Sequence, residues 1–450
     1  MLPIVIVLAA LEAPAQIKQF KLEAKERLEY ALLLIICLIP ALVPNWINDE
    51  SAYYLPSIKW YAEEGFVSGL GQWNIRYALS SSWHVLSAIF YWDFFPDRIW
   101  NFNGLLLFLF CLDYLRRYSK LLPLIPLLVL SAPFLNAPSP DLPILLCTVF
   151  LMQYHAQLSA REWSFMLLFI LGIKATGLSL LLIGVYPLLK YRVQFLRYAW
   201  VLVPFGALWL IKNQVLTGHL LFPMNSAWIP SDHTLPISML AEFRNGVLAE
   251  VYGLGFSGND WLQANMGFGD RLFGLFKLKP YKVVMNLVVL GGGFMMIMFY
   301  ASSKVRRIPV MSLWVAMSLV LWLIMAPNYR FGLGIGIGAM LILLQGQAFI
   351  RFGAIAHRLS LAILVGAVTW LNTSGTKNVR VVSCGDPHEL SINQLLYPVP
   401  YPELSSERVE TEVPYYRPID CLYCGDAPRP CLPDTVKRTH EGLGVRPWTK

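Results

Sequence analysis

Two adjacent acidic residues, Asp49 and Glu50, lie in the stretch NWINDESAYYLPSIKWYAEEGF at residues 45–66. The stretch directly follows the apolar run ALLLIICLIPALVP at 31–44. A carboxylate can accept a proton from a reacting hydroxyl group as a general base. Adjacent side chains diverge on a helix, so the two acids cannot share one proton, and one acts while the other orients or binds. The alternative is that both acids only mark a membrane–water interface, with the nearby Trp and Tyr side chains as an aromatic belt.

Three further ionisable residues lie at the edges of apolar runs: Asp141, Lys174 and Arg330. An ionisable residue at membrane depth is a functional candidate by default. For each of the three there is also an alternative interpretation in which the residue has only a structural role. Asp141 is an N-cap for the run LPILLCTVF, Lys174 a lysine that snorkels to the interface, and Arg330 an interface residue at the end of a span.

The composition is that of a membrane protein. The 450 residues are 56% hydrophobic and 14% charged, with a mean hydropathy of +0.52, which is too apolar for a single soluble core of this length. The net charge is +8, but the Lys and Arg residues fall in short loops between apolar runs, where they orient a membrane protein. We therefore expect no nucleic-acid partner.

The fold class that follows is an all-α polytopic membrane protein with about 10 to 11 transmembrane helices. The expected spans are 29–44, 99–115, 121–135, 142–158, 164–173, 175–189, 198–211, 282–300, 309–326, 331–350 and 359–371. The basic clusters between them then share the cytoplasmic side. This topology requires residues 80–92 to lie along the outer surface, and 164–189 to be a pair of spans bent at Lys174.

The same topology divides the chain into a transmembrane domain, 1–371, and a small extracytoplasmic tail, 372–450. The first outer loop, 45–98, and the long segment 212–281 lie on the same face as the tail. Most polar residues outside the basic clusters gather on that outer face, which predicts a site at the outer membrane surface.

The tail is rich in proline and holds four of the seven cysteines: Cys384, Cys421, Cys424 and Cys431. An even group of cysteines in a loop-rich exposed segment indicates disulfides in an oxidising compartment, with three connectivities open. The alternative is a zinc site, because Cys421-x-x-Cys424 is half of a ribbon motif, but no second such pair follows. The remaining cysteines fall in apolar runs as small hydrophobic residues: Cys37, Cys111 and Cys147.

Several short motifs follow one another along the chain. NDESAYY, YAEEGFVSGLG and NIRYALSSSWHVL come first, followed by SAPFLNAPSPDLPILL with Asp141 and GIKATGL with Lys174. WLIKNQVLTGHLLFP at 209–223 and APNYRFGLG at 326–334 come later, and DAPRPC at 426–431 lies in the tail.

In this order the motifs resemble those of the GT-C superfamily, multi-pass glycosyltransferases that use polyprenyl-phosphate sugars. The superfamily includes protein O-mannosyltransferases and lipid A aminoarabinose transferases. The first three motifs look like its first outer loop. The segment at 209–223 is similar to its R-N-x-x-x-[ST]-G-x-x-x-x-P pattern, with Lys212 where Arg is usual. The segment at 326–334 is similar to its P-D-x-R-[FY]-G element, with Asn328 in place of Asp.

The resemblance implies roles for individual residues. Asp49 matches the first-loop acid and is our choice of general base, with Glu50 second. Arg330, whose planar fork suits phosphate, and then Lys174 would meet the charge on the leaving lipid phosphate. Asp141 would assist the first-loop acid by binding the acceptor or a divalent cation.

The roles of Arg76 and His84, and the presence of a metal ion, are not decided by the sequence. Arg76 and His84 would be additional contacts to donor phosphate or acceptor sugar, but a lone histidine on an interfacial helix is more often a surface residue. Metal dependence varies within the superfamily, so a divalent cation, Mg²⁺ or Mn²⁺, on Asp49 and Asp141 is not settled by two separated carboxylates.

The run GLGIGIGA at 332–339 is not a nucleotide-binding loop, because no strand precedes it. Gly334 and Gly338 have the spacing that allows helices to pack closely. We therefore expect this segment to lie against another helix.

The sequence thus predicts a glycosyltransferase that moves a sugar from a polyprenyl-phosphate carrier to an acceptor at the outer face of a bacterial inner membrane. The acceptor is an exported protein such as pilin, lipid A or a cell-surface glycan, and membrane lipid is a further partner. The alternatives are a transporter or flippase of lipid-linked sugars, an O-antigen-type polymerase, and a membrane scaffold. The transporter is disfavoured because no internal repeat is evident and few ionisable residues lie near the midplane of the expected spans.

Overall fold

The computed structural model describes residues 24–38, 49–79, 81–91, 101–118, 121, 123–135, 137–174, 180, 182–200, 202–225, 229, 231–252, 269, 274–275, 280–302, 309–325, 327–345, 406–409 and 415–418. Most of these residues are helical, as the sequence predicts. In the tail, β1 (Ser406–Val409) pairs antiparallel with β2 (Tyr415–Pro418). Cys384, Cys421, Cys424 and Cys431 lie outside the described residues, as do the disulfides or zinc site expected for them.

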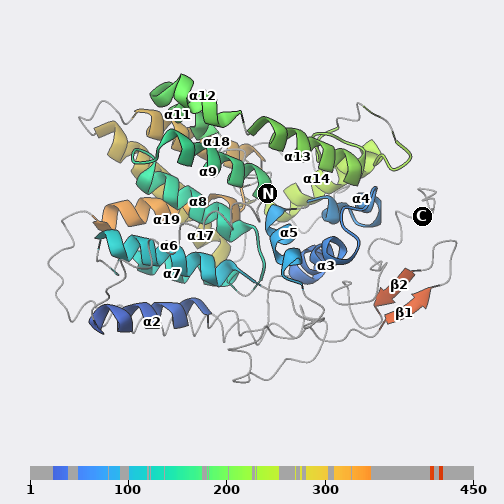
Figure 1. The fold of residues 1–450 in the computed structure, drawn as a ribbon, viewed down its shortest axis with the longest axis horizontal. Helices are drawn as coiled ribbons and strands as arrows, with labels where there is room; N and C mark the ends of the chain where they lie inside the picture. Colours follow the sequence, from blue (N-terminus) through green and yellow to red (C-terminus); the bar gives the residue numbers. More distant parts are fainter. Residues whose placement is uncertain are drawn as a thin grey trace.

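The helices form a bundle in which segments distant in the sequence pack together. They are α2 (Ala24–Leu38), α3 (Leu55–Glu63), α4 (Leu70–Trp73), α5 (Ser82–Ile89), α6 (Asn103–Tyr118), α7 (Leu124–Ser131), α8 (Asp141–Tyr154), α9 (Ala160–Ile173), α11 (Val185–Tyr191), α12 (Val193–Ala199), α13 (Leu202–Thr217), α14 (Ile237–Val251), α17 (Pro280–Ser302), α18 (Pro309–Met325) and α19 (Tyr329–Gln345). Short turns connect some of them: the π-helical η2 (Glu50–Tyr54) and the 3₁₀ segments η3 (Ile75–Leu79), η4 (Ala132–Phe134) and η6 (Leu182–Gly184). Helix α19 packs against α7, α8 and α17, and α6 packs against α2 and α8 (Figure 1).

Helix α19 lies between the two largest apolar clusters of the core. Leu333, Ile337 and Leu341 recur every four residues and join a cluster with side chains of α2, α6, α7 and α8. Ile335 and Ala339 face the other cluster, which comes from α9, α17 and α18 among others. Residues four apart share one face of a helix, so α19 is apolar on two faces because it is buried between two layers.

Glycines let α19 approach its neighbours closely. A Cβ on Gly334 would lie 2.9 Å from the Leu145 carbonyl oxygen of α8, and one on Gly338 would lie 2.5 Å from the Met152 sulfur. A Cβ on Gly336 would lie 2.6 Å from the Val288 carbonyl oxygen of α17. The close packing predicted for this glycine run is therefore confirmed, with α8 and α17 as its partners.

The segment 49–91 contains η2, α3, α4, η3 and α5, and several of its aromatic side chains are buried. Tyr54 and Tyr77 are buried in one apolar cluster with Tyr53 and Trp73. These residues form a core, so the alternative of an aromatic belt does not describe them. Helix α5 also packs against α3 and α9, and its side chains Trp83, His84 and Leu86 are buried. The expected placement of 80–92 along an outer membrane surface stays a prediction.

The expected spans are the main point on which the sequence prediction is wrong. None of the helices in the described ranges combines the length and the apolar content that crossing a bilayer requires. The run at 121–135, for example, gives an 8-residue α7 followed by a 3₁₀ turn, and the run at 142–158 gives a 14-residue α8. The predicted bundle of about 10 to 11 transmembrane helices is therefore contradicted. Placement in a bacterial inner membrane stays a prediction that nothing in the described residues tests.

The cysteines of the helices behave as predicted. Cys37, Cys111 and Cys147 are buried free thiols. Cys37 and Cys111 join the cluster on one side of α19, and Cys147 joins the cluster on the other side.

Helix α17 offers a matched test of the glycine contacts. A Cβ on Gly292 would lie 2.6 Å from the Gly336 Cα, whereas a Cβ on the neighbouring Gly291 meets nothing within 4 Å. We expect Gly292→Ala to lower the free energy of unfolding by about 1–3 kcal/mol through overpacking. Gly291→Ala should leave it unchanged or raise it by about 0.5–1 kcal/mol, because alanine favours the helix. Denaturant titration of both variants measures the difference, and equal stabilities would contradict the contact.

Candidate functional site

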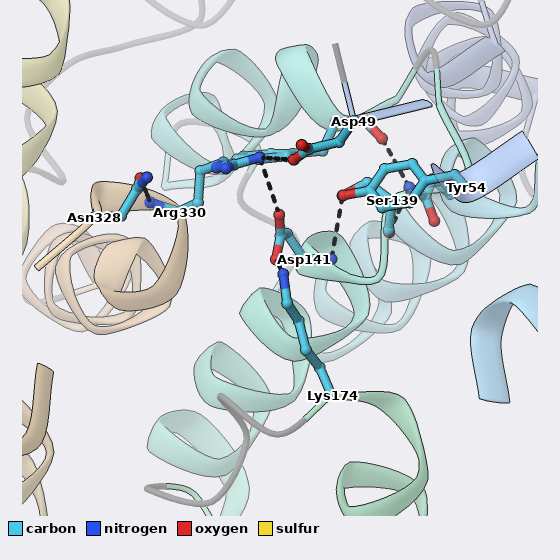
Figure 2. A network of polar contacts seen from close by, with 9 residues as sticks. Asp49, Tyr54, Ser139, Asp141, Lys174, Asn328 and Arg330 are labelled. Carbon is cyan, nitrogen blue, oxygen red and sulfur yellow. Dashed lines mark hydrogen bonds and ion pairs between the residues drawn. The ribbon is translucent and has the colours of Figure 1, made fainter. Parts of the chain in front are cut away.

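Four charged side chains from separate parts of the chain meet in one network (Figure 2). Asp49 directly precedes η2, Asp141 is the first residue of α8, Lys174 directly follows α9, and Arg330 is the second residue of α19. They alternate in sign, with Arg330 between the two carboxylates and Lys174 beyond Asp141. The side chains of Asp49, Lys174 and Arg330 each keep about a fifth of their surface exposed, at 21%, 19% and 19%. A solute can therefore reach the network.

The shortest contact to Arg330 comes from Asp49. The Arg330 guanidinium donates a hydrogen bond of 2.6 Å to the Asp49 Oδ2 atom. Burial acts to raise the pKa of Asp49, but the charges of Arg330, Lys174 and Arg76 outweigh it, and the net shift is downward. Burial likewise disfavours the charged guanidinium, whereas Asp49 and Asp141 raise the pKa of Arg330 well above its ordinary value. Both groups are therefore ionised at neutral pH.

Asp141 is the most deeply buried member of the network, at 2% exposure. Its Oδ1 atom accepts a hydrogen bond of 2.5 Å from the Lys174 ammonium group. Its Oδ2 atom lies 3.8 Å from the Arg330 guanidinium and has no hydrogen-bond donor within the described part of the chain. Lys174 also lies over the ring of Phe331, 4.7 Å from its centre. Asp141 thus holds one cation by a direct hydrogen bond and attracts the other across a wider gap.

Helix ends explain which of these placements are favourable. Asp141 lies at the positive N-terminal end of α8 and Lys174 at the negative C-terminal end of α9, so both helix dipoles stabilise the charges. Arg330 lies at the N-terminal end of α19, where the dipole disfavours a cation. Its charge depends on the two carboxylates, and an anion that binds it gains from the same helix end.

The backbone before Asp141 is held by residues that the sequence reasoning did not select. The amide nitrogen of Asn103 lies 2.7, 2.8 and 3.0 Å from the carbonyl oxygens of Phe134, Ala137 and Ser139. The indole of Trp83 donates a 2.8 Å hydrogen bond to the Asn103 side-chain oxygen and so fixes its orientation. The available sequence signal was a polar residue, Asn103, at the start of the apolar run GLLLFLF.

Ser139 links the backbone at Asp141 to Tyr54, which lies in η2, the turn that directly follows Asp49. Its hydroxyl accepts a 3.3 Å hydrogen bond from the backbone N–H of Asp141 and lies 3.5 Å from the Tyr54 hydroxyl. Pro140 is the N-cap residue of α8, so Asp141 is not the N-cap that its alternative reading assumed. The Asp141 carboxylate instead belongs to the charged network.

Asn328 fixes the start of the helix that carries Arg330. Its side-chain oxygen accepts a 3.1 Å hydrogen bond from the Arg330 backbone N–H, and its carbonyl oxygen accepts a 2.7 Å bond from the Trp322 indole. Asp and Asn both provide an oxygen for this capping role. The departure from Asp at this position therefore keeps the local structure that presents Arg330.

The segment at 209–223 also owes its pattern to local structure. Thr217 donates a 2.7 Å hydrogen bond to the Asn213 carbonyl oxygen and accepts one of 3.0 Å from the His219 backbone N–H. Gly218 ends α13 with φ +74°, a conformation that side chains other than glycine rarely adopt. Lys212, the departure from Arg, lies 5.8 Å from the centre of the Trp209 ring, and burial lowers the pKa of its amine to about 8.

His84 lies in the core rather than on a surface, with 1% of its surface exposed. Its ring packs against Tyr54 at 4.8 Å between centres, and neither ring nitrogen has a hydrogen-bond partner of ordinary geometry among the described residues. Burial and then the charge of Lys174 lower the pKa of His84 to about 3, although the nearby Pro138 carbonyl opposes part of this shift. The imidazole is therefore neutral at physiological pH and cannot attract phosphate by charge.

Arg76, a further predicted residue, stands apart from the direct contacts of the network. Arg76, in η3, is partly exposed and acts on Asp49 through its charge. The side chain of Glu50 lies outside the description. No group of three or more His, Cys, Asp or Glu side chains suited to a metal ion occurs in the described ranges. Arg330 is the cation between Asp49 and Asp141, so the two carboxylates do not fit the expected Mg²⁺ or Mn²⁺ site.

The fold and the network define a helical protein with a partly exposed charged site built at helix ends. Residues 4–337 match the family model described as "Domain of unknown function (DUF8201)". The match covers more than half of the 450-residue chain, so the protein belongs to this family. No curated protein and no solved structure matches the chain.

The capping role of Asn328 can be tested by stability. Asn328→Ala removes the side-chain oxygen and should lower the free energy of unfolding by about 1 kcal/mol. Asn328→Asp keeps an acceptor and should stay close to the wild type. Thermal or denaturant unfolding of both variants measures this, and a loss in the Asp variant equal to that in the Ala variant would exclude the cap.

The buried His84 should make the protein sensitive to acid. Its pKa is lowered on folding, so its contribution to stability is complete above the ordinary histidine pKa of about 6.5 and is lost as pH falls toward the folded value of about 3. Between these two pH values, one such group lowers the free energy of unfolding by up to about 1.4 kcal/mol for each pH unit of acidification. We expect His84→Leu to lose stability less steeply than the wild type between pH 6 and pH 4. Parallel stability curves would show that the ring is not buried in its neutral form.

Proposed function

We propose that the protein is a glycosyltransferase that moves a sugar from a polyprenyl-phosphate carrier to a hydroxyl group of an acceptor. One observation carries the proposal. Asp49, Asp141, Lys174 and Arg330 come from four separate motifs of the GT-C resemblance, and they lie in one network although Asp49 and Arg330 are 281 residues apart. A set of unrelated interface residues would have no reason to converge in this way.

Asp49 is the proposed general base. Its low pKa keeps it deprotonated, so it can accept the proton of an acceptor hydroxyl group. A carboxylate held this strongly by Arg330 is a weak base, however. Donor phosphate that binds Arg330 would compete with Asp49 for the guanidinium and so raise the pKa of Asp49 toward its ordinary value. Donor binding would thereby strengthen the base at the moment when the acceptor needs it.

The charges around the network suit a donor phosphate of low charge. Among the side chains that the structure describes here, Asp49 and Asp141 supply two negative charges, and Arg330, Lys174 and Arg76 supply three positive ones, which leaves one positive charge in excess. A sugar joined to a polyprenyl carrier through one phosphate is a phosphodiester with one negative charge. The Arg330 guanidinium can donate hydrogen bonds to two oxygens of this phosphate, and Lys174 supplies a second positive charge nearby.

The transfer then follows from these positions. Asp49 takes the proton of the acceptor hydroxyl group as its oxygen attacks the anomeric carbon of the sugar. The bond between that carbon and the phosphate oxygen breaks, and its electron pair leaves with the polyprenyl phosphate. Arg330 and Lys174 stabilise the additional negative charge that develops on this leaving group. Asp141 keeps Lys174 in place by their hydrogen bond.

Turnover by variants of Asp49 tests the proposal. The purified full chain is incubated with a panel of polyprenyl-phosphate sugars, each in the presence of a pilin protein, lipid A or a cell-surface glycan as acceptor, and release of polyprenyl phosphate is measured. We expect Asp49→Asn to lower kcat by about 10²–10⁴-fold, as loss of a general base does. Glu50→Gln, measured alongside, tests the second choice of base.

Asp113→Asn is the matched control, because Asp113 forms a 2.8 Å ion pair with Arg117 on the exposed face of α6. Its turnover should equal that of the wild type. Wild-type turnover in Asp49→Asn would remove the proposed base, and turnover of no donor by the wild type would overturn the proposed function.

A further inference from the structure

A continuous outer edge of the molecule, made by α11, α12 and α13, combines exposed apolar and basic side chains. Figure 1 shows the three helices along one edge of the bundle. We call this edge the basic apolar edge and define it by the exposed residues Leu189, Val193, Leu196, Trp200, Val203 and Leu208 together with Arg192 and Arg197. Val193 and Val203 are 78% and 73% exposed, which is unusual for large apolar side chains that recur in one segment.

The charge of this segment is entirely positive. Residues 163–231 contain no Asp or Glu, and their charged residues are Lys174, Lys190, Arg192, Arg197 and Lys212. Arg192 and Arg197 are exposed, and neither forms an ion pair in the described part of the chain. Two unpaired guanidinium groups beside exposed leucine, valine and tryptophan are the composition of a surface that lies on anionic lipid.

The backbone at Arg192, within the basic apolar edge, is strained. Arg192 joins α11 to α12 with φ 46° and ψ −118°, a conformation that costs a non-glycine residue about 1–3 kcal/mol. Glycine would relieve this strain, yet the position carries an exposed arginine.

We propose that the basic apolar edge docks the protein on the surface of an anionic bilayer, with α11, α12 and α13 lying in the interface. This inference does not rest on the proposed reaction. A second copy of the chain fits less well, because a symmetric contact through this edge would bring the same arginines together. The apolar side chains would enter the boundary between head groups and acyl chains, while the guanidinium groups pair with lipid phosphate.

Vesicle flotation tests the proposal with the full chain. The probes are vesicles of phosphatidylcholine with phosphatidylglycerol and vesicles of phosphatidylcholine alone. We expect the wild type to float with the anionic vesicles at low salt, and more weakly at 1 M salt, where screening shortens to about 3 Å. The double variant Arg192→Gln with Arg197→Gln should weaken binding about 25-fold, at about fivefold for each basic residue. Val193→Asn with Val203→Asn should weaken binding to both kinds of vesicle about tenfold or more.

Two control variants change the same chemistry elsewhere. Arg116→Gln with Arg117→Gln alters the net charge equally on α6, and Ile35→Asn with Leu109→Asn replaces exposed apolar residues of α2 and α6. Both should float like the wild type. Circular dichroism of all variants checks that they fold, which the exposure of the replaced side chains favours.

Three results of the flotation assay would overturn the proposal. The wild type fails to float with anionic vesicles, the edge variants float like the wild type, or the control variants lose binding equally. Soluble polyglutamate provides the contrast with an acidic protein partner. If it binds the wild type as tightly as vesicles do, and the valine variants retain that binding, the edge recognises acidic protein rather than lipid.

Discussion

The placement of Arg330 between Asp49 and Asp141 is the constraint on which the site depends. A cation at the N-terminal end of α19 is unfavourable by itself, and the two carboxylates make it stable. Removal of either acid would leave a partly buried charge less well compensated. The four helix ends that supply the network are therefore held together by charge as well as by the apolar clusters. The same balance leaves Arg330 able to exchange one anion for another, as the proposed binding of a donor phosphate requires.

Packing far from the network sets its geometry. The glycines of α19 bring its axis close to α8 on one side and α17 on the other. Because Arg330 lies in the first turn of α19 and Asp141 begins α8, the close approach of these two helices also sets the distance between the two side chains. A larger residue at Gly334 would press on Thr148 and Leu145 of α8 and so act on the site from a distance. The glycine run thus has a positional role in the site without any contact to a ligand.

The helical class and the charged residues of the network could be predicted from the sequence. The packing of the helices as short elements on one another, in place of transmembrane spans, could not. Asp49, Asp141, Lys174 and Arg330 were recognisable as ionisable residues at the edges of apolar runs, and α9 ends at Ile173, directly before Lys174. The transmembrane bundle was wrong because composition does not distinguish a lipid-facing run from a short helix packed on its neighbours, as α7 and α8 are. The support from Asn103 and Trp83 could not be predicted, since those hydrogen bonds exist only once distant segments meet.

The residues that carry the resemblance to the GT-C superfamily fall into two groups according to their contacts. Asn213, Thr217, Gly218 and Asn328 shape the backbone at helix ends, and the same pattern can arise wherever such a turn is needed. These positions are weak support for a shared reaction. The four charged side chains differ, because their hydrogen bonds and ion pairs join separate segments of the chain. The case for a transferase acting on a phosphate-linked sugar therefore rests on these four side chains, and a departure such as Asn328 does not weaken it.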